Sequence, residues 1–167
     1  MAKDFSFDIV SDFDPQEMTN ALDQTQREIA NRYDFKGTNS KIDFLEGSKD
    51  ELLLLVDSEY KLTALIDILS SKMISRGLSL KILDLSSPNE EASGNMVRKK
   101  IKLLKGLDQE KAKKVTKLIR EDYPKAKANI QGDTVRVSSA KKDELQEIMT
   151  LLKSAELDFP LQFENYR

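Results

Sequence analysis

The stretch Met96–Leu104 alternates apolar and basic residues with the two-residue period of a β-strand. Val97, Ile101 and Leu103 fall on one face of this strand, and Arg98, Lys100 and Lys102 fall on the other. The stretch also begins a second copy of an order of elements that starts at Phe5. We therefore interpret it as the boundary between two similar small domains.

The first copy of this order runs from Phe5 to about residue 83. A short alternating strand at Phe5–Ile9 precedes Asp14, which is suited to cap a helix whose apolar stripe recurs every three or four residues. That helix ends near Arg32, and Ser58 caps a second one that stops at Arg76-Gly77. The remaining strands are predicted at residues 40–44, 51–56 and 78–82. Along the chain, these strands and helices follow the order βαββαβ.

The second copy follows a polar connector at residues 86–95. Its helices are predicted to open at Asp108 and Lys141, and its strands cover residues 96–104, 125–131, 134–138 and 161–166, with Ala126, Ala128 and Ile130 pointing inward from the second of these. Two such copies predict an α+β fold of two tandem ferredoxin-like, RNA-recognition-like domains, at residues 1–90 and 95–167. Helices cover one face of each sheet and leave the other open.

Composition excludes several kinds of site. The 167 residues include no cysteine and no histidine. Disulfides, thiol nucleophiles and thiolate metal sites are therefore excluded, along with the commonest acid–base residue and transition-metal ligand. The carboxylates lack an apolar context that would raise a pKa, and no glycine-rich phosphate loop is present. We predict a protein that is not an enzyme and that uses no cofactor or metal.

Charge is divided unevenly along the chain. Residues 1–94 hold 10 Lys/Arg and 18 Asp/Glu, whereas residues 95–167 hold 17 and 11, within a net charge of −2. Such asymmetry indicates either a polyanion partner or docking of the acidic half on the basic half, and charge alone leaves both open. The first twenty residues lack an apolar signal core, and no apolar run approaches the roughly 18 residues of a membrane span. We expect a cytoplasmic protein with no membrane partner.

The outward positions of the second copy are almost all cations or amide and hydroxyl donors. Such a face suits phosphates, base edges and ribose hydroxyls, although lysine also fills ordinary solvated faces. RNA-binding sheets of this type usually stack bases on aromatic side chains, which these positions lack, so phosphate-led binding is favoured. The positions are Arg98, Lys100, Lys102, Lys125, Lys127, Asn129, Gln131, Thr134, Arg136 and Ser138.

A second candidate site is the hexapeptide Arg32–Gly37, RYDFKG, at the exit of the first helix. Arg32 and Lys36 can contact phosphate or a guanine edge, and the two aromatic residues can stack on bases. Lys72 and Arg76, one helical turn apart, can add to such a pocket. The residues fit equally well a helix stop with Phe35 in the core and the charges in solvent.

Five segments of the chain together resemble the YajQ family of bacterial cytoplasmic proteins: FSFDIVS at Phe5–Ser11, RYDFKG at Arg32–Gly37, SKMISRG at Ser71–Gly77, IQGDTVRV at Ile130–Val137, and PLQFENYR at Pro160–Arg167. The resemblance implies that the two domains exchange their first strands. Strand 5–10 would be lent to the second domain and strand 96–104 to the first, which brings Ser6 and Asp8 next to Lys127 and Arg136. It also implies nucleotide binding, with GTP, ATP, transfer RNA (tRNA) or cyclic di-GMP as ligands.

Together, these observations predict a non-catalytic nucleotide- or RNA-binding protein that contacts phosphate or guanine groups. The alternative is a regulatory module that holds a partner protein on the free sheet and on the apolar outer face of Glu51–Val56. The residues predicted to bind the nucleotide are Arg32, Lys36, Lys72, Arg76, Arg98, Lys127, Arg136 and Arg167.

Overall fold

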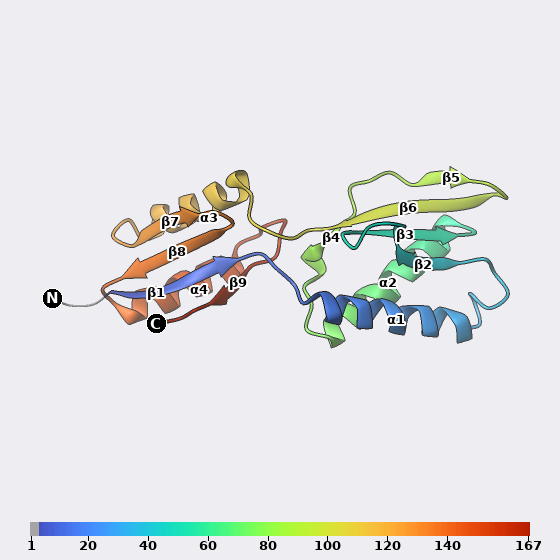
Figure 1. Cartoon of the computed structure of the whole chain (residues 1–167), viewed down its shortest axis with the longest axis horizontal. Coiled ribbons are helices and arrows are strands. Elements are labelled where there is room, and N and C mark those ends of the chain that lie inside the picture. Colours follow the sequence, from blue (N-terminus) through green and yellow to red (C-terminus); the bar gives the residue numbers. More distant parts are fainter. Residues whose placement is uncertain (1–3) are drawn as a thin grey trace. The chain divides into compact units, whose positions relative to one another are not determined.

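The computed structural model describes residues 4–167, which form two compact units. The central unit comprises Phe13–Leu104, and the terminal unit comprises the described residues up to Asp12 together with Lys105–Arg167. Each unit combines one antiparallel sheet with two helices (Figure 1). The predicted α+β class with ferredoxin-like domains is therefore confirmed.

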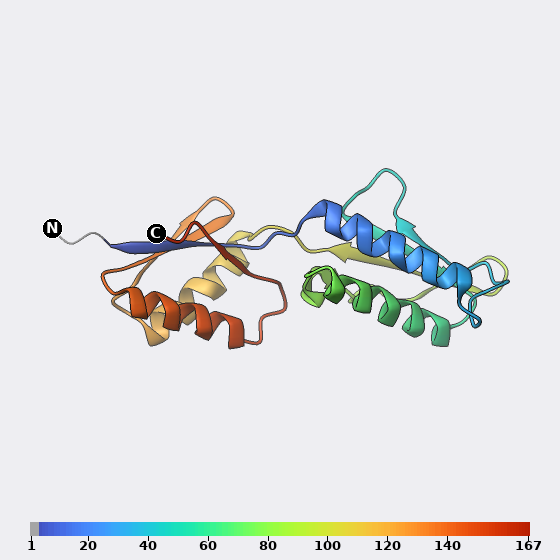
Figure 2. The same ribbon diagram turned by 90° about the horizontal axis from the view of Figure 1, so that it is seen from below.

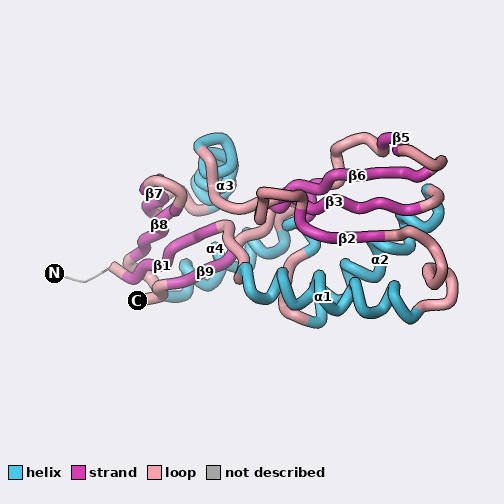
Figure 3. Tube along the Cα trace, turned by 45° about the vertical axis from the view of Figure 1, so that its right-hand side comes forward, coloured by secondary structure: helices cyan, strands magenta, loops and turns pink. Residues whose placement is uncertain are grey.

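The sheet of the central unit has the strand order β2-β3-β6-β4, and β5 pairs with β6 beside this path. Both helices cover the same face of the sheet (Figure 3). The elements are α1 (Pro15–Asn31), β2 (Lys41–Phe44), β3 (Glu51–Val56), α2 (Glu59–Ser75), β4 (Leu83–Asp84), β5 (Glu90–Ala92) and β6 (Met96–Leu103).

The sheet of the terminal unit has the order β7-β8-β1-β9. Its two helices again lie on one side of the sheet (Figure 2). The elements are β1 (Phe5–Val10), α3 (Gln109–Asp122), β7 (Lys127–Gln131), β8 (Thr134–Ser139), α4 (Lys142–Ser154) and β9 (Gln162–Glu164).

The two units exchange strands. Strand β1 lies between β8 and β9, although it precedes α1 in the chain, and β6 lies between β3 and β4, although it precedes α3 (Figure 1). Each exchanged strand takes the position that the first strand of a βαββαβ unit occupies, next to the third strand and the fourth. The exchange that the family resemblance implies is therefore confirmed.

Apolar side chains fix both exchanged strands in their sheets. Ile101 of β6 lies directly opposite Leu52 of β3 and is fully buried in the core of the central unit. Phe7 and Ile9 of β1 are fully buried in the core of the terminal unit, beneath α3 and α4. Each full burial of such a side chain contributes about 1.5–3 kcal/mol, so neither sheet keeps its core without the strand from outside.

The exchange also evens out the charge of the chain. The central unit carries 13 Lys/Arg and 15 Asp/Glu, and the terminal unit, counted from residue 4, carries 13 and 14. Four of the cations lie on β6, a strand from the basic half of the sequence that belongs to the unit formed mainly by the acidic half. The asymmetry between the two halves is thus largely a result of strand exchange, so it does not by itself indicate a polyanion partner.

Three local expectations were wrong. Residues 78–82 do not form a strand, because Ser79 caps a short 3₁₀ helix at Leu80–Ile82 that leads into the two-residue β4. The polar connector contains β5, which forms a hairpin with β6. Ile130, expected inside, is 41% exposed at the end of β7.

No helix within residues 4–167 is both long and apolar enough to span a membrane.

The exchange predicts which fragments fold. Residues 1–90 contain both helices of the central unit but lack β6, so β3 would lose its inner neighbour and the core would lose Ile101 and Leu103. Residues 13–104 contain every element of that unit. We expect cooperative urea unfolding, followed by circular dichroism, for fragment 13–104 and a broad transition or aggregation for fragment 1–90. A cooperative fragment 1–90 would contradict this account.

Candidate functional site

The open face of the sheet in the terminal unit carries polar side chains from all four strands. Strand register places Asn129, Arg136, Asp8 and Glu164 in one row across the sheet, since directly opposite residues project from the same face. Gln131 and Thr134 form a neighbouring pair on β7 and β8. This face therefore offers hydrogen-bonding and charged groups but almost no apolar surface.

Asp8 and Arg136 form the centre of this face. The guanidinium of Arg136 donates from Nε to Asp8 Oδ1 at 2.9 Å and from Nη2 to Oδ2 at 3.4 Å. Asn165 Nδ2 donates to the same Oδ2 at 2.9 Å. Asp8 is 5% exposed, and the hydrogen bond from Arg136 lowers the pKa of its carboxyl despite burial. The pair orients Arg136 and keeps Asp8 ionised.

The next row of the sheet places two cations on either side of two hydroxyl groups. Lys127 lies opposite Ser138, Ser138 lies opposite Ser6, and Ser6 exchanges two backbone hydrogen bonds with Arg167 at 3.0 and 2.8 Å. Neither Lys127 nor Arg167 forms an ion pair with any residue in the range 4–167. The row Lys127–Ser138–Ser6–Arg167 therefore holds a cation at each end and hydroxyl donors between them, and the charge of Arg167 also acts on Asp8 in the neighbouring row. We call these four residues the serine row.

The hexapeptide RYDFKG forms the turn between α1 and β2. Phe35 is buried in the core, Tyr33 is almost fully exposed, and Gly37 takes φ +82°, a left-handed conformation that glycine adopts readily. The guanidinium of Arg32 lies 5.9 Å from the ring centre of Phe35 and 2.8 Å from Asp34 Oδ1. The helix-stop interpretation is thus correct for Phe35, while Lys36 remains exposed.

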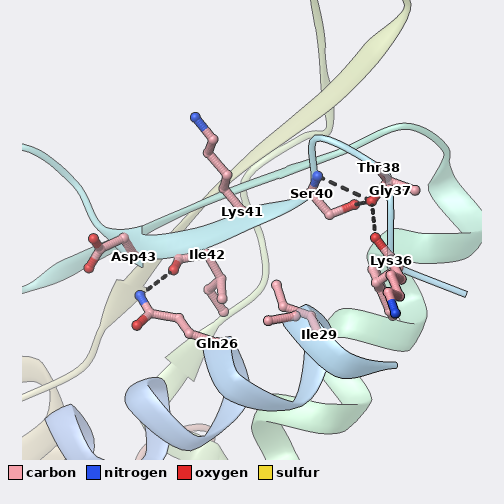
Figure 4. Close-up of a pocket in the computed structure, with 11 residues that line it drawn as sticks. Gln26, Ile29, Lys36, Gly37, Thr38, Ser40, Lys41, Ile42 and Asp43 are labelled. Atoms are coloured by element: carbon pink, nitrogen blue, oxygen red, sulfur yellow. Dashed lines mark hydrogen bonds between the residues drawn. The ribbon is translucent and has the colours of Figure 1, made fainter. Parts of the chain in front are cut away.

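A pocket of about 390 Å³ lies beside this turn, between α1 and the edge strand β2 (Figure 4). Gln26 closes one side by donating to the carbonyl of Ile42 at 2.8 Å, and Thr38 and Ser40 bond to each other at 2.8 Å. Lys36 and Lys41 extend in opposite directions, as Figure 4 shows. The polar groups are satisfied locally and the cations do not converge, so the pocket is poorly suited to hold a phosphate.

Three other predicted cations are paired with carboxylates: Lys72 lies within α2, and Arg32 and Arg76 directly follow α1 and α2. Glu28 of α1 contacts both Arg32, at 3.6 Å, and Lys72, at 2.9 Å. Arg76 lies 3.1 Å from Glu17. Arg32 and Lys72 are thus brought together, but around an acidic group, and they belong to the helical layer. A phosphate would have to displace Glu28 to reach them.

Arg98 lies on the open face of the central sheet, where Nε and Nη2 contact Glu90 Oε2 at 3.1 and 2.9 Å. The eight predicted residues are therefore spread over both units. Three of them, Lys127, Arg136 and Arg167, share one sheet face. The sequence pattern did not reveal Asn165, which takes a left-handed φ of +56° at the end of β9. Asparagine adopts this conformation more readily than most residues, but the side-chain contact depends on the exchange of β1.

Comparison with known proteins identifies the family. The sequence profile described as "Nucleotide-binding protein YajQ-like" matches residues 5–167. The chain belongs to the YajQ-like family. It is 50% identical over 167 residues to a "Nucleotide-binding protein" of Trichodesmium erythraeum, and the alignment covers all of both chains. Similar relatives named in the same way are a protein of Acaryochloris marina, 52% identical over all of both chains, and one of Heliobacterium modesticaldum, 47% identical over all of this chain and 99% of the relative.

The relatives of this YajQ-like chain are named for binding nucleotides, and these names describe no reaction. Within residues 4–167, no group of three or more Asp, Glu, His or Cys side chains is placed to hold a metal ion. The observations that bear on function are therefore the charged and donor groups on the open sheet faces.

The Asp8–Arg136 pair predicts a pH dependence of stability. Because the folded-state pKa of Asp8 is lowered, the pair stabilises the fold above the unfolded-state pKa near 4. This contribution is lost as the pH falls through the folded-state value. We expect urea unfolding at pH 6 and pH 3 to show a smaller stability loss for Asp8→Asn than for the native chain. Equal losses in the two proteins would contradict the proposed role of the pair.

Proposed function

We propose that this protein binds nucleotides through their phosphate groups, without transforming them, on the open face of the terminal sheet. The observation that supports the proposal most directly is the serine row, in which Lys127 and Arg167 flank the hydroxyls of Ser138 and Ser6. Charge-assisted hydrogen bonds from such cations to phosphate are short and strong. Hydroxyl groups between the cations supply further donors.

The width of the row indicates the class of ligand. Neighbouring strands lie about 4.8 Å apart, so the row from β7 to the end of the chain spans about 14 Å at the backbone. A single phosphate fills only part of that length, whereas GTP, ATP, cyclic di-GMP or consecutive phosphates of tRNA fill more of it. Arg136 lies in the adjacent row, and its Nη1 has no hydrogen-bond partner within residues 4–167.

Side chains next to the phosphate contacts can read the base or the sugar. Asn129, Gln131 and Thr134 lie on the same face and supply amide and hydroxyl groups. A binding role without catalysis agrees with the state of Asp8. A carboxyl with a lowered pKa is a weak base and is not protonated near neutral pH, so it is suited to orient Arg136 rather than to transfer protons.

The proposal predicts the effect of removing Lys127 and Arg167, the two cations of the serine row. We expect Lys127→Gln and Arg167→Gln each to weaken GTP binding about tenfold, the loss of one charge-assisted hydrogen bond, in isothermal titration calorimetry. Lys114→Gln, on the exposed surface of α3, removes the same charge away from the sheet and serves as the matched control. Unchanged affinity in both sheet variants would exclude the serine row as the phosphate site.

A salt titration separates the classes of ligand. Affinity for tRNA should fall steeply with salt, with a log–log slope of about 0.7–0.9 for each phosphate neutralised, whereas affinity for ATP or cyclic di-GMP should fall less. Lys127→Gln should lower the slope for tRNA by about one phosphate. A slope that does not change in this variant places the contacts with the RNA backbone elsewhere.

A further inference from the structure

The open face of the central sheet differs from that of the terminal sheet because its middle is apolar. Leu53 and Leu55 of β3 project from this face, since the residues that alternate with them, Leu52 and Leu54, are fully buried beneath the helices. Both side chains are half-buried although no helix covers them. The two leucines therefore form a flat apolar floor, which we call the leucine floor.

Three cations and one carboxylate flank the leucine floor on the two neighbouring strands. Leu55 lies between Lys41 of β2 and Arg98 of β6, and Leu53 lies between Asp43 of β2 and Lys100 of β6. Directly opposite residues have Cβ atoms about 5 Å apart, so all three cations begin next to the leucines. Lys41 and Lys100 form no ion pair with any residue in the range 4–167, whereas Arg98 is held by Glu90.

A cavity of about 460 Å³ lies over this floor, and the β5 arm forms its wall. Its lining residues are Leu53, Leu55, Glu91, Ala92, Ser93 and Arg98. Figure 1 shows β5 running along β6 at the edge of the sheet. The cavity thus combines an apolar floor with the cationic residue Arg98, and residues of the arm bound it on one side.

The arm is fixed by Lys99, which the sequence pattern places on the apolar face of β6. Lys99 is 7% exposed, and its Nζ donates to the carbonyl oxygen of Leu85 at 3.1 Å, to that of Ser87, and to Asn89 Oδ1 at 3.4 Å. An ammonium group withdrawn from water in this way is compensated by those three acceptors. Lys99 therefore ties the segment that leads into β5 to the sheet, and so shapes the wall of the cavity.

We propose that the leucine floor is a second binding site, which takes the planar base of a nucleotide with its phosphate on Lys100 or Lys41. The inference rests on the proposed nucleotide binding and adds a site that the serine row does not include. A flat ring can pack on the two leucines, because sites for planar ligands are lined mostly by apolar side chains. The volume suits a mononucleotide, and the two lysines beside the floor, Lys41 and Lys100, match the charge of its phosphate.

Three probes separate the contributions of the ring and the phosphate: adenosine 5′-monophosphate, ribose 5-phosphate and adenosine. Calorimetry on the full chain should give two sites for adenosine 5′-monophosphate. Leu55→Ser should weaken one of them about tenfold, as expected when about 50 Å² of apolar contact is lost, and should leave ribose 5-phosphate unaffected. Lys100→Gln should weaken both phosphate-bearing probes at that site and leave adenosine unaffected.

The matched control is Lys102→Gln, two residues along the same strand and on the same face. Lys102 lies between Glu51 and Asp84 instead of beside a leucine, so it should leave all three probes unchanged. Each variant is first compared with the native chain by thermal unfolding. If Leu55→Ser lowers the melting temperature, amide shift changes at Lys100 during titration provide the second measurement, and their absence overturns the proposal.

The outcomes distinguish the two sites. If Lys127→Gln weakens binding at one site while Leu55→Ser and Lys100→Gln change nothing, the leucine floor is excluded and the serine row stands. If only the leucine-floor variants weaken binding, the serine row fails instead. The proposal would also be overturned if the leucine-floor variants lost the binding of a partner protein but kept the binding of nucleotide.

The role of Lys99 gives a separate prediction. Lys99→Met should increase hydrogen exchange at residues 85–93 and weaken binding at the second site, whereas Lys99→Arg should keep both close to those of the native chain. Weaker binding without faster exchange would contradict the role of Lys99 in positioning the arm.

Discussion

Pairing between each sheet and a strand from the other half of the sequence is the interaction on which the structure depends. Strand β6 supplies the central unit with Ile101 and Leu103, and β1 supplies the terminal unit with Phe7 and Ile9. Both strands lie inside their sheets, so each contributes backbone hydrogen bonds on two sides as well as core side chains. Neither half of the chain contains a complete sheet, and the burial of apolar surface in one unit requires residues from both halves.

The two sheets share one topology but present different surfaces, and the exchanged strands cause much of this difference. On the terminal sheet, β1 contributes Asp8, which pairs with Arg136 and makes the centre of the face ionic. On the central sheet, β6 contributes Arg98 and Lys100 beside the leucines of β3. The same backbone arrangement therefore presents a polar surface in one unit and an apolar surface flanked by cations in the other.

Periodicity predicted most of the elements because amphipathic patterns depend on local sequence. The stripe Met18, Leu22, Thr25 and Ile29 is buried as expected, and α3 and α4 begin within a residue of their predicted starts. The strand expected at residues 78–82 was wrong because Ser79 favours a local 3₁₀ turn. The exchange itself left no periodic signal. A strand that pairs with distant residues has the same alternation as one that pairs with near ones, so only the family resemblance indicated it.

The candidate sites were less predictable than the fold, since the sequence does not show which charged side chains form ion pairs with each other. Arg32, Lys72 and Arg76 appeared available, but Glu28, Glu17 and Asp34 contact them. The alternation places Lys99 on the apolar face of β6, but it does not show that carbonyl oxygens bind the ammonium group there. The serine row could be anticipated only in part. Ser6 and Lys127 follow from the exchange, whereas the position of Arg167 depends on its backbone hydrogen bonds to Ser6.

Those backbone bonds join residues that lie 161 positions apart in the sequence, and this has a consequence for synthesis on the ribosome. Residues 5–10 emerge well before the other strands of their sheet, because that sheet also needs β8, β9 and Arg167. At a translation rate of about 5–20 residues per second, β1 remains without its partner strands for roughly 10–30 s. The central unit, by contrast, is complete once Leu104 has left the exit tunnel. Translation therefore separates the assembly of the two sheets in time, and β1, which precedes every other described strand in the chain, is among the last to be placed.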